Sequence, residues 1–176
     1  EENGTSYLVT DYAAGMNVKQ YMSWKGVPFP EAQALSLMGP VLEAVERMHE
    51  RGILHRDISP ENLILKPDGR LVLIDFGAAR EYHPGEGENL TVILKRGYAP
   101  EEQYSADGNQ GPWTDIYACC AVLYQMMSGI LPQEAAARRE KDMLTPLDRI
   151  PGLAVSGRTA RVLERGMSLD PADRYG

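Results

Sequence analysis

The sequence predicts a mainly α-helical α+β fold with short β-hairpins, and three patterns carry that prediction. Apolar residues recur at three- and four-residue steps from Pro30 to Gly52, which is the period of an amphipathic helix. Residues 115–127 are apolar nearly all round, so we expect a buried helix there. Two short apolar runs, Leu63–Leu65 and Leu71–Ile74, flank a Lys-Pro-Asp-Gly-Arg turn, which predicts a β-hairpin.

The other elements follow from local signals. Residues Ser6–Asp11 predict a strand and Asn17–Met22 a short helix. Residues 133–142 predict an exposed helix, and residues 156–167 a last helix. Thr114 is the predicted cap of the buried helix. In the long helix, the predicted core face consists of Leu35, Met38, Leu42, Val45 and Met48.

Composition restricts the class of protein. The chain of 176 residues, 43% hydrophobic and 24% charged, has the profile of one soluble globular domain. Its net charge of −7 argues against nucleic acid or an anionic membrane as the main partner. Cys119 and Cys120 are adjacent and are the only cysteines, which excludes a disulfide framework and a paired-cysteine zinc site. No apolar run reaches transmembrane length, and we expect a cytoplasmic location.

Polar residues at the two ends of the predicted hairpin indicate metal-assisted phosphoryl transfer. Asn62 precedes the first strand and Asp75 follows the second, so the hairpin brings both side chains to neighbouring strand ends. Amide and carboxylate oxygens suit a hard cation such as Mg²⁺. Asp57 lies a few residues earlier, within reach of a substrate hydroxyl beside that metal. These are the parts that phosphoryl transfer needs from one side of a cleft.

These residues resemble a known family. His55-Arg56-Asp57, with Asn62 five residues later, followed by Asp75-Phe76-Gly77, resembles the catalytic and metal loops of eukaryotic-type (Hanks-type) protein kinases. The resemblance continues in the family's order with Ala99-Pro100-Glu101, Asp115-Ile116-Tyr117 and Asp170–Tyr175. It implies that residues 1–13 are the last N-lobe strand and hinge. Residues 14–176 would then be the C-terminal lobe, incomplete at its C-terminal end.

The resemblance implies a Ser/Thr protein kinase, of bacterial type, that transfers the γ-phosphate of ATP to protein hydroxyls with Mg²⁺. Asp57 would act as the catalytic base, and Asn62 and Asp75 would hold the metal. The protein substrate would be its main partner. The implied ATP contacts are Thr10, Asp11, Ala13, Asn17, Ile64 and Asp75.

One departure from the family concerns catalytic charge. Ser/Thr-specific members carry a lysine two residues after the catalytic aspartate, where this chain has Ser59. The segment before Ala99 carries Lys95 at a point where the family usually has threonine. We predict that Lys95 supplies the charge that Ser59 cannot, so that both residues belong to the catalytic set with Asp57. The alternative is that Lys95 is a solvated loop charge.

The resemblance also assigns structural roles. Asp115 would accept backbone N–H groups of the catalytic loop, and Glu101 would pair with Arg174. His55 and Phe76 would pack beneath the metal loop. Arg56 would receive a regulatory phosphate on Thr91.

The family's Gly-rich phosphate loop, its strand lysine and its partner-glutamate helix have no counterpart in the sequence. The chain therefore resembles a C-terminal lobe whose N-terminal lobe is largely missing, and we expect it to be inactive alone. The strand edge at Ser6–Asp11 predicts self-association. Membrane anchoring of the full-length protein stays open. Two other functions also stay open: a pseudokinase docking scaffold, and a small-molecule phosphotransferase of the antibiotic-modifying type.

Overall fold

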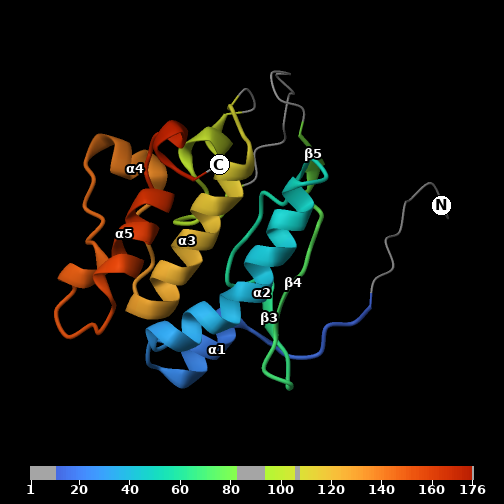
Figure 1. Ribbon diagram of the computed structural model, residues 1–176, viewed down its shortest axis with the longest axis vertical. Coiled ribbons are helices and arrows are strands. Elements are labelled where there is room, and N and C mark those ends of the chain that lie inside the picture. The colour runs from blue at the N-terminus through green and yellow to red at the C-terminus, as the bar shows by residue number, and fades with distance from the viewer. Residues whose placement is uncertain (1–10, 83–93, 106–107, 176) are drawn as a thin grey trace.

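A computed structural model describes residues 11–82, 94–105 and 108–175 of the chain (Figure 1). The predicted strand at Ser6–Asp11, except Asp11 itself, and the residues Thr10 and Thr91 lie outside the described ranges. The described chain is mainly helical with few short strands, as predicted. Its α-helices are α1 (Val18–Lys25), α2 (Glu31–His49), α3 (Pro112–Ser128), α4 (Ala135–Glu140) and α5 (Gly157–Gly166). Its 3₁₀ helices are η1 (Glu101–Tyr104), η2 (Leu147–Arg149) and η3 (Pro171–Asp173).

The strands form two small antiparallel sheets. They are β1 (Met16–Asn17), β2 (Ile53–Leu54), β3 (Leu63–Leu65), β4 (Leu71–Leu73) and β5 (Arg80–Glu81). The first sheet has the order β1-β3-β4, and the second pairs β2 with β5. The β3–β4 pair is the predicted hairpin, with Leu63 opposite Leu73.

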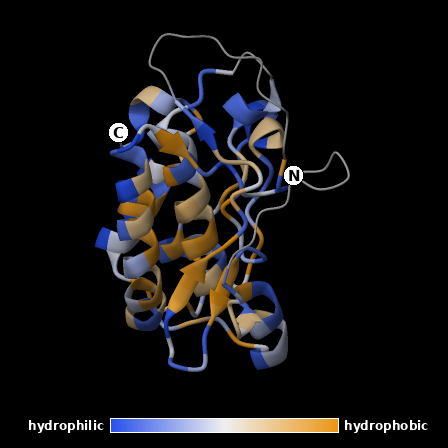
Figure 2. Ribbon diagram, turned by 90° about the vertical axis from the view of Figure 1, so that its right-hand side faces the viewer, coloured by the Kyte–Doolittle hydropathy of each residue, from blue (hydrophilic) through white to orange (hydrophobic). Residues whose placement is uncertain are grey.

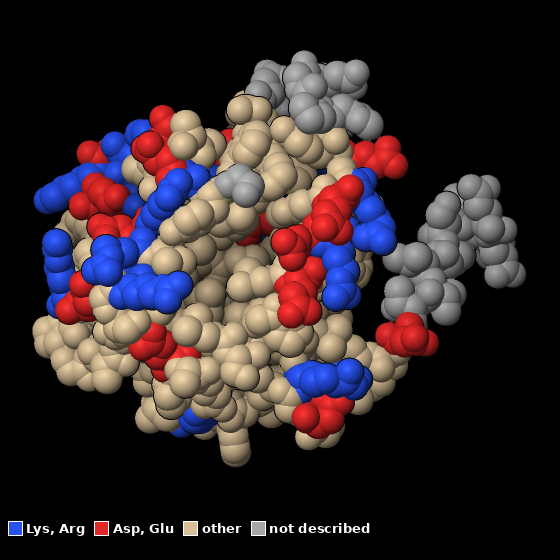
Figure 3. All heavy atoms as spheres, viewed as in Figure 1, with Lys and Arg blue, Asp and Glu red and all other residues tan. Residues whose placement is uncertain are grey.

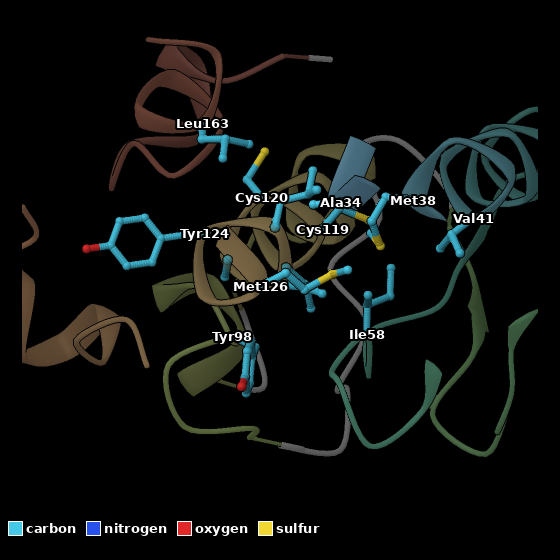
Figure 4. Packing of buried hydrophobic residues seen from close by; sticks show 14 of the residues in the cluster. Ala34, Met38, Val41, Ile58, Tyr98, Cys119, Cys120, Tyr124, Met126 and Leu163 are labelled. Carbon is cyan, nitrogen blue, oxygen red and sulfur yellow. The ribbon is translucent and has the colours of Figure 1, made fainter. Parts of the chain in front are cut away.

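Helix α3 lies at the centre of the molecule, with α2 and β4 on one side and α5 on the other (Figure 1). It is buried nearly all round, as its sequence predicts. It begins three residues earlier than expected, because Gly111 occupies the N-cap position and donates its N–H to Thr114 Oγ1 at 3.1 Å. Figure 2 shows the apolar residues on the inner sides of these elements. The cluster drawn in Figure 4 includes Ala34, Met38, Cys119, Cys120, Met126 and Leu163.

The buried face of α2 agrees with the predicted one at Met38 and Val45 and differs from it at Leu35 and Leu42. The helix buries Ala34, Met38, Val41 and Val45, whereas Leu35 and Leu42 are 41% and 42% exposed. The cause is that α3 and β4 pack on the face that carries the smaller residues. Leu35 and Leu42 instead line a mainly apolar hollow beside α5, with Arg158 also in its lining. Figure 3 shows an uncharged area between basic and acidic groups on this face of the molecule.

Helix ends follow capping chemistry. Asn17 caps α1, since its Oδ1 accepts the Gln20 N–H at 2.8 Å, and the helix runs to Lys25 rather than Met22. Ser156 caps α5. The segment 133–142 is helical only over α4 and is not fully exposed, because Ala135 and Arg138 are buried. Within the described ranges, no helix combines the length and apolarity that crossing a bilayer requires.

Candidate active site

The catalytic loop is fixed to the core by one buried carboxylate. Asp115, on α3, has no exposed surface and accepts the backbone N–H groups of His55 and Arg56 at 2.9 and 2.8 Å. Its Oδ2 also lies 2.8 Å from Nε2 of His49 on α2. A buried carboxylate needs such donors. This confirms the structural role expected for Asp115.

The two carboxylate oxygens of Asp57 have different surroundings. Asn62 Nδ2 donates to Asp57 Oδ2 at 2.9 Å and to the Asp57 carbonyl at 2.8 Å, which fixes the side chain. Oδ1 is buried and has no hydrogen-bond partner among the described residues. Burial raises the pKa of the Asp57 carboxyl, while Lys95 and Asn62 act in the opposite direction. Asp57 therefore offers one positioned, free acceptor oxygen.

The β3–β4 hairpin brings Asn62 and Asp75 to adjacent strand ends. The N–H of Ile74, next to Asp75, donates to the Asn62 carbonyl at 2.9 Å. Asp75 takes a left-handed conformation with φ of 66°, and its Oδ1 accepts the Gly77 N–H at 3.1 Å. The Phe76 ring lies 5.2 Å from the His55 ring, centroid to centroid, which confirms that the two side chains are in contact. Only His55 is buried, since Phe76 is 47% exposed.

The donor set fits Mg²⁺. Asn62 uses its amide nitrogen on Asp57, which leaves its amide oxygen for a cation, and the exposed Asp75 adds a carboxylate. In ranges 11–82, 94–105 and 108–175, no group of three or more His, Cys, Asp or Glu side chains could hold a metal. A site with two protein ligands suits Mg²⁺, which keeps waters and takes further oxygens from substrate phosphates.

Lys95 and Ser59 approach Asp57 differently. Lys95 Nζ lies 3.9 Å from the free Oδ1 of Asp57. Ser59 is fully buried, and its Oγ has no hydrogen-bond partner in the described part of the chain. Lys95 is therefore the cation that the structure places at Asp57, and Ser59 is an interior hydroxyl beneath the loop.

The predicted nucleotide contacts cluster at the start of the described chain. Asp11 is exposed, while Ala13 and Ile64 are half-buried. Gly15 lies so close to β3 that a Cβ would be 2.4 Å from the Leu65 carbonyl oxygen, and its φ is +153°. The segment leading into β1 thus crosses directly over Ile64. Asn17 belongs to the same sheet, but its side-chain oxygen is engaged in the α1 cap.

The expected Glu101–Arg174 ion pair is wrong by one residue. Arg174 pairs with Glu102, at 2.6 Å from NH1 to Oε1, and both side chains are nearly fully buried. Glu101 points outward to Arg139. The 3₁₀ turn of η1 separates the two neighbouring glutamates in this way, and the sequence alone does not reveal which one faces inward.

Sequence reasoning missed two glutamines that hold Arg56. Gln103 donates to the Arg56 carbonyl at 2.8 Å, and Arg56 Nε donates to Gln110 Oε1 at 2.7 Å. Both glutamines are buried. The only signal in the sequence was the presence of two uncharged amides in a polar segment, which does not specify a partner.

Comparisons with known proteins agree with this fold. A family model described as a protein kinase domain matches residues 1–172. "Serine/threonine-protein kinase F" of Synechocystis sp. is 34% identical over 173 residues, which are 96% of this chain and 34% of that protein. "Serine/threonine-protein kinase pkn3" of Myxococcus xanthus is 30% identical over 190 residues, covering 98% of this chain and 34% of that protein.

A solved structure, "PpkA-294 apo form", matches with a TM-score of 0.79 and 34% identity, covering 99% of this chain and 61% of that one. The fold and the anchored catalytic loop define the helical C-terminal lobe of a protein kinase. The chain belongs to the protein kinase domain family, and these two bacterial relatives are named serine/threonine-protein kinases. The chain spans 34% of the length of each of these two relatives.

Proposed function

We propose that this chain provides the catalytic lobe of a protein serine/threonine kinase, which transfers the γ-phosphoryl group of ATP to a hydroxyl of a protein substrate. The observation that carries the proposal is the state of Asp57. One carboxylate oxygen is held by Asn62, and the other is buried, free and adjacent to a lysine ammonium. Residues 14–176 would form this lobe, and residues 1–13 would be the strand and hinge that precede it.

In this proposal, Asp57 Oδ1 accepts a hydrogen bond from the substrate hydroxyl and orients its oxygen toward the phosphoryl group. The hydroxyl oxygen forms the new P–O bond, the bond to the ADP oxygen breaks, and the hydroxyl proton passes to Asp57. Asn62 keeps the carboxylate from rotating during this step. The raised pKa of Asp57 makes it a better proton acceptor than an ordinary surface aspartate.

The Asn62 amide oxygen and the Asp75 carboxylate would hold Mg²⁺, which neutralises phosphate charge when bound. Ala13 and Ile64 would contact the adenine, with Asp11 and Thr10 preceding them along the hinge. Asn17 would lie near the ribose. Lys95 would stabilise the negative charge that develops on the transferring phosphoryl group.

The buried, unpaired Cys119 and Cys120 support a reducing, cytoplasmic location for this lobe. A docking scaffold would have no need of a fixed carboxylate with a free oxygen. A small-molecule phosphotransferase would use the same acid. The buried Arg174–Glu102 pair, which ties the segment after Lys95 to the lobe, favours a protein substrate.

The test is a Mg²⁺-ATP phosphorylation assay on the full-length gene product, because family members bind ATP between two lobes. We expect incorporation of phosphate into protein Ser or Thr, and a loss of about three orders of magnitude or more with Asp57→Asn. Asp75→Asn should abolish turnover, because it removes the carboxylate that would hold Mg²⁺. Arg47→Gln, an exposed change on α2, serves as the control.

Three outcomes are informative. Transfer only to small molecules would support the antibiotic-modifying type. Wild-type turnover in the Asp57→Asn variant would overturn the assignment of the base. An inactive but well-folded wild-type protein would support the scaffold.

A further inference from the structure

Glu61, four residues after Asp57, is already paired with a cation of the same chain. Lys19 Nζ on α1 lies 2.7 Å from Glu61 Oε1, and the Lys19 N–H donates to the Pro60 carbonyl at 3.2 Å. Burial favours the neutral acid, but the Lys19 hydrogen bond and charge outweigh it, so the pKa of Glu61 is lowered. The carboxylate is therefore ionised. Its Oε1 is paired with Lys19, while its Oε2 is buried and has no hydrogen-bond partner among the described residues.

Two other acids near the acceptor position are paired in the same way. Glu134 lies 3.7 Å from Arg96, and Asp57 lies 3.9 Å from Lys95. A peptide that carries arginine would have to displace an internal cation to pair with Glu61, Glu134 or Asp57. The displaced lysine or arginine of the chain would then lie close to the peptide's arginine, and the two positive charges would repel each other.

Next to the Lys19–Glu61 pair, a groove of about 360 Å³ lies between α1 and the C-terminal end of α3. Its lining includes Met22, Val27, Pro28 and Gln125. Helix α1 and the C-terminal end of α3 lie together at one end of the molecule (Figure 1). The loop after α1 is joined to α3 there, because the Phe29 N–H donates to the Met126 carbonyl at 2.7 Å. Gln125 also accepts the hydroxyl of Tyr98, three residues after Lys95. The groove is thus continuous with the segment that carries Lys95.

Large apolar side chains are exposed around this groove and around the segment 94–98. Trp24 is 74% exposed, Val27 55%, Ile130 49% and Leu131 51%. Leu131 lies against the segment 94–98, since a Cβ on Gly97 would be 3.0 Å from Leu131 Cδ1. Exposed apolar groups gathered beside a catalytic group indicate a surface that a partner covers.

We infer that this surface selects acceptor segments in which a large apolar residue flanks the Ser or Thr, and that it disfavours arginine or lysine there. The inference rests on the proposed kinase function, whose substrate class it specifies. Lys19, Met22 and Val27, which line the groove, would be specificity-determining residues. An apolar side chain of the peptide gains binding free energy when the groove removes it from water. A cationic side chain gains less, because the acids beside the groove are already paired with cations of the chain.

The test compares three acceptor peptides of equal length, with leucine, arginine or glutamate flanking one Ser. For the wild-type full-length gene product, we expect kcat/KM for the leucine peptide to exceed that for the arginine peptide by about ten-fold. Lys19→Met keeps the aliphatic stem and frees Glu61, so the arginine-to-leucine ratio should rise about five-fold. The double variant Lys19→Met/Glu61→Gln should lose that gain.

A binding arm does not depend on turnover. Trp24 is an exposed fluorophore on α1, the helix whose Lys19 and Met22 line the groove, so the leucine peptide should change its fluorescence, and Trp24→Phe should abolish that change. Val27→Glu, at an exposed position, should weaken binding of the leucine peptide in a folded protein. Active enzyme with equal kcat/KM for all peptides, or with a preference for arginine, would overturn the inference and leave the kinase function intact. Failure of the wild type to phosphorylate any protein or peptide, with leucine-peptide binding preserved, would overturn the kinase function alone.

Discussion

Asp57 and Lys95 form the ion contact from which we predict that Lys95 supplies the charge that Ser59 cannot. The ammonium of Lys95 lies 3.9 Å from Asp57 Oδ1, although Lys95 is 38 positions further along the chain. A lysine near the free oxygen favours the ionised carboxylate, and in the proposed reaction it would also stabilise the charge on the transferring phosphoryl group. Ser59 is buried and cannot present a charge at this point.

We predict that Lys95→Ala lowers kcat by about ten-fold or more, which is a loss of at least ~1.4 kcal/mol of transition-state stabilisation. Its second effect is on pH dependence. The pKa of Asp57 is raised by burial and lowered by Lys95, so removing the lysine raises it further. The base works only when ionised, so activity falls as pH drops through this pKa. The acidic limb of kcat/KM should therefore move to higher pH, as steady-state rates across a pH series would show.

Ser59→Lys in the Lys95→Ala background should restore part of kcat, since the charge returns two residues after Asp57. Arg96→Ala is the matched control, because Arg96 is an exposed neighbour that pairs with Glu134. A Lys95→Ala enzyme with unchanged rate and unchanged acidic limb would identify Lys95 as a solvated loop charge.

At the scale of elements, the sequence predicted the β3–β4 hairpin, α2, α3 and α5, because hydrophobic period, the Asp-Gly turn and caps are local signals. It predicted that Asn62 and Asp75 lie at neighbouring strand ends, because the start of the first strand and the end of the second strand of a hairpin are adjacent. It predicted the buried Met38 and Val45 of α2 but also counted Leu35 and Leu42 on that face, because all four fit one apolar stripe. Which part of the stripe faces inward depends on where α3 and α5 pack, and that is a long-range contact.

The corrected face of α2 can be tested by stability. Met38→Ala should lower the free energy of unfolding by about 2–5 kcal/mol, because Met38 has no exposed surface. Leu35→Ala should cost less than about 1 kcal/mol, because Leu35 stays partly in water. Urea denaturation of both variants measures the difference. Equal losses would mean that Leu35 is covered in solution.

At the scale of the whole molecule, the Arg174–Glu102 pair joins the segment after Lys95 to the C-terminal part of the lobe. Arg174 also donates to the carbonyls of Ser168 and Leu169, at 2.7 and 3.0 Å. Neighbouring glutamates made this partner ambiguous in the sequence, and the same holds for Gln103 and Gln110. Their positions depend on contacts between segments that are far apart, for which a single sequence carries no pattern.

Glu102→Ala should therefore lower the free energy of unfolding by about 3–5 kcal/mol, because it leaves the buried Arg174 guanidinium without its carboxylate. Glu101→Ala, which breaks the partly exposed pair with Arg139, should cost no more than about 1 kcal/mol. Thermal unfolding of the two variants side by side provides the measurement. The reverse order of stabilities would restore the pairing first expected from the sequence.

Asp115 gives the molecule a further property. Its single carboxylate joins α3, α2 through His49, and the backbone of the catalytic loop at His55 and Arg56. Because these contacts hold the catalytic loop, we expect the loop to fold and unfold together with α3 and not as a separate cooperative unit. A partly unfolded molecule in which α3 has opened therefore has no assembled site. Active-site titration of this lobe would count folded molecules, and the loop amides would exchange with solvent as slowly as those of the central helix.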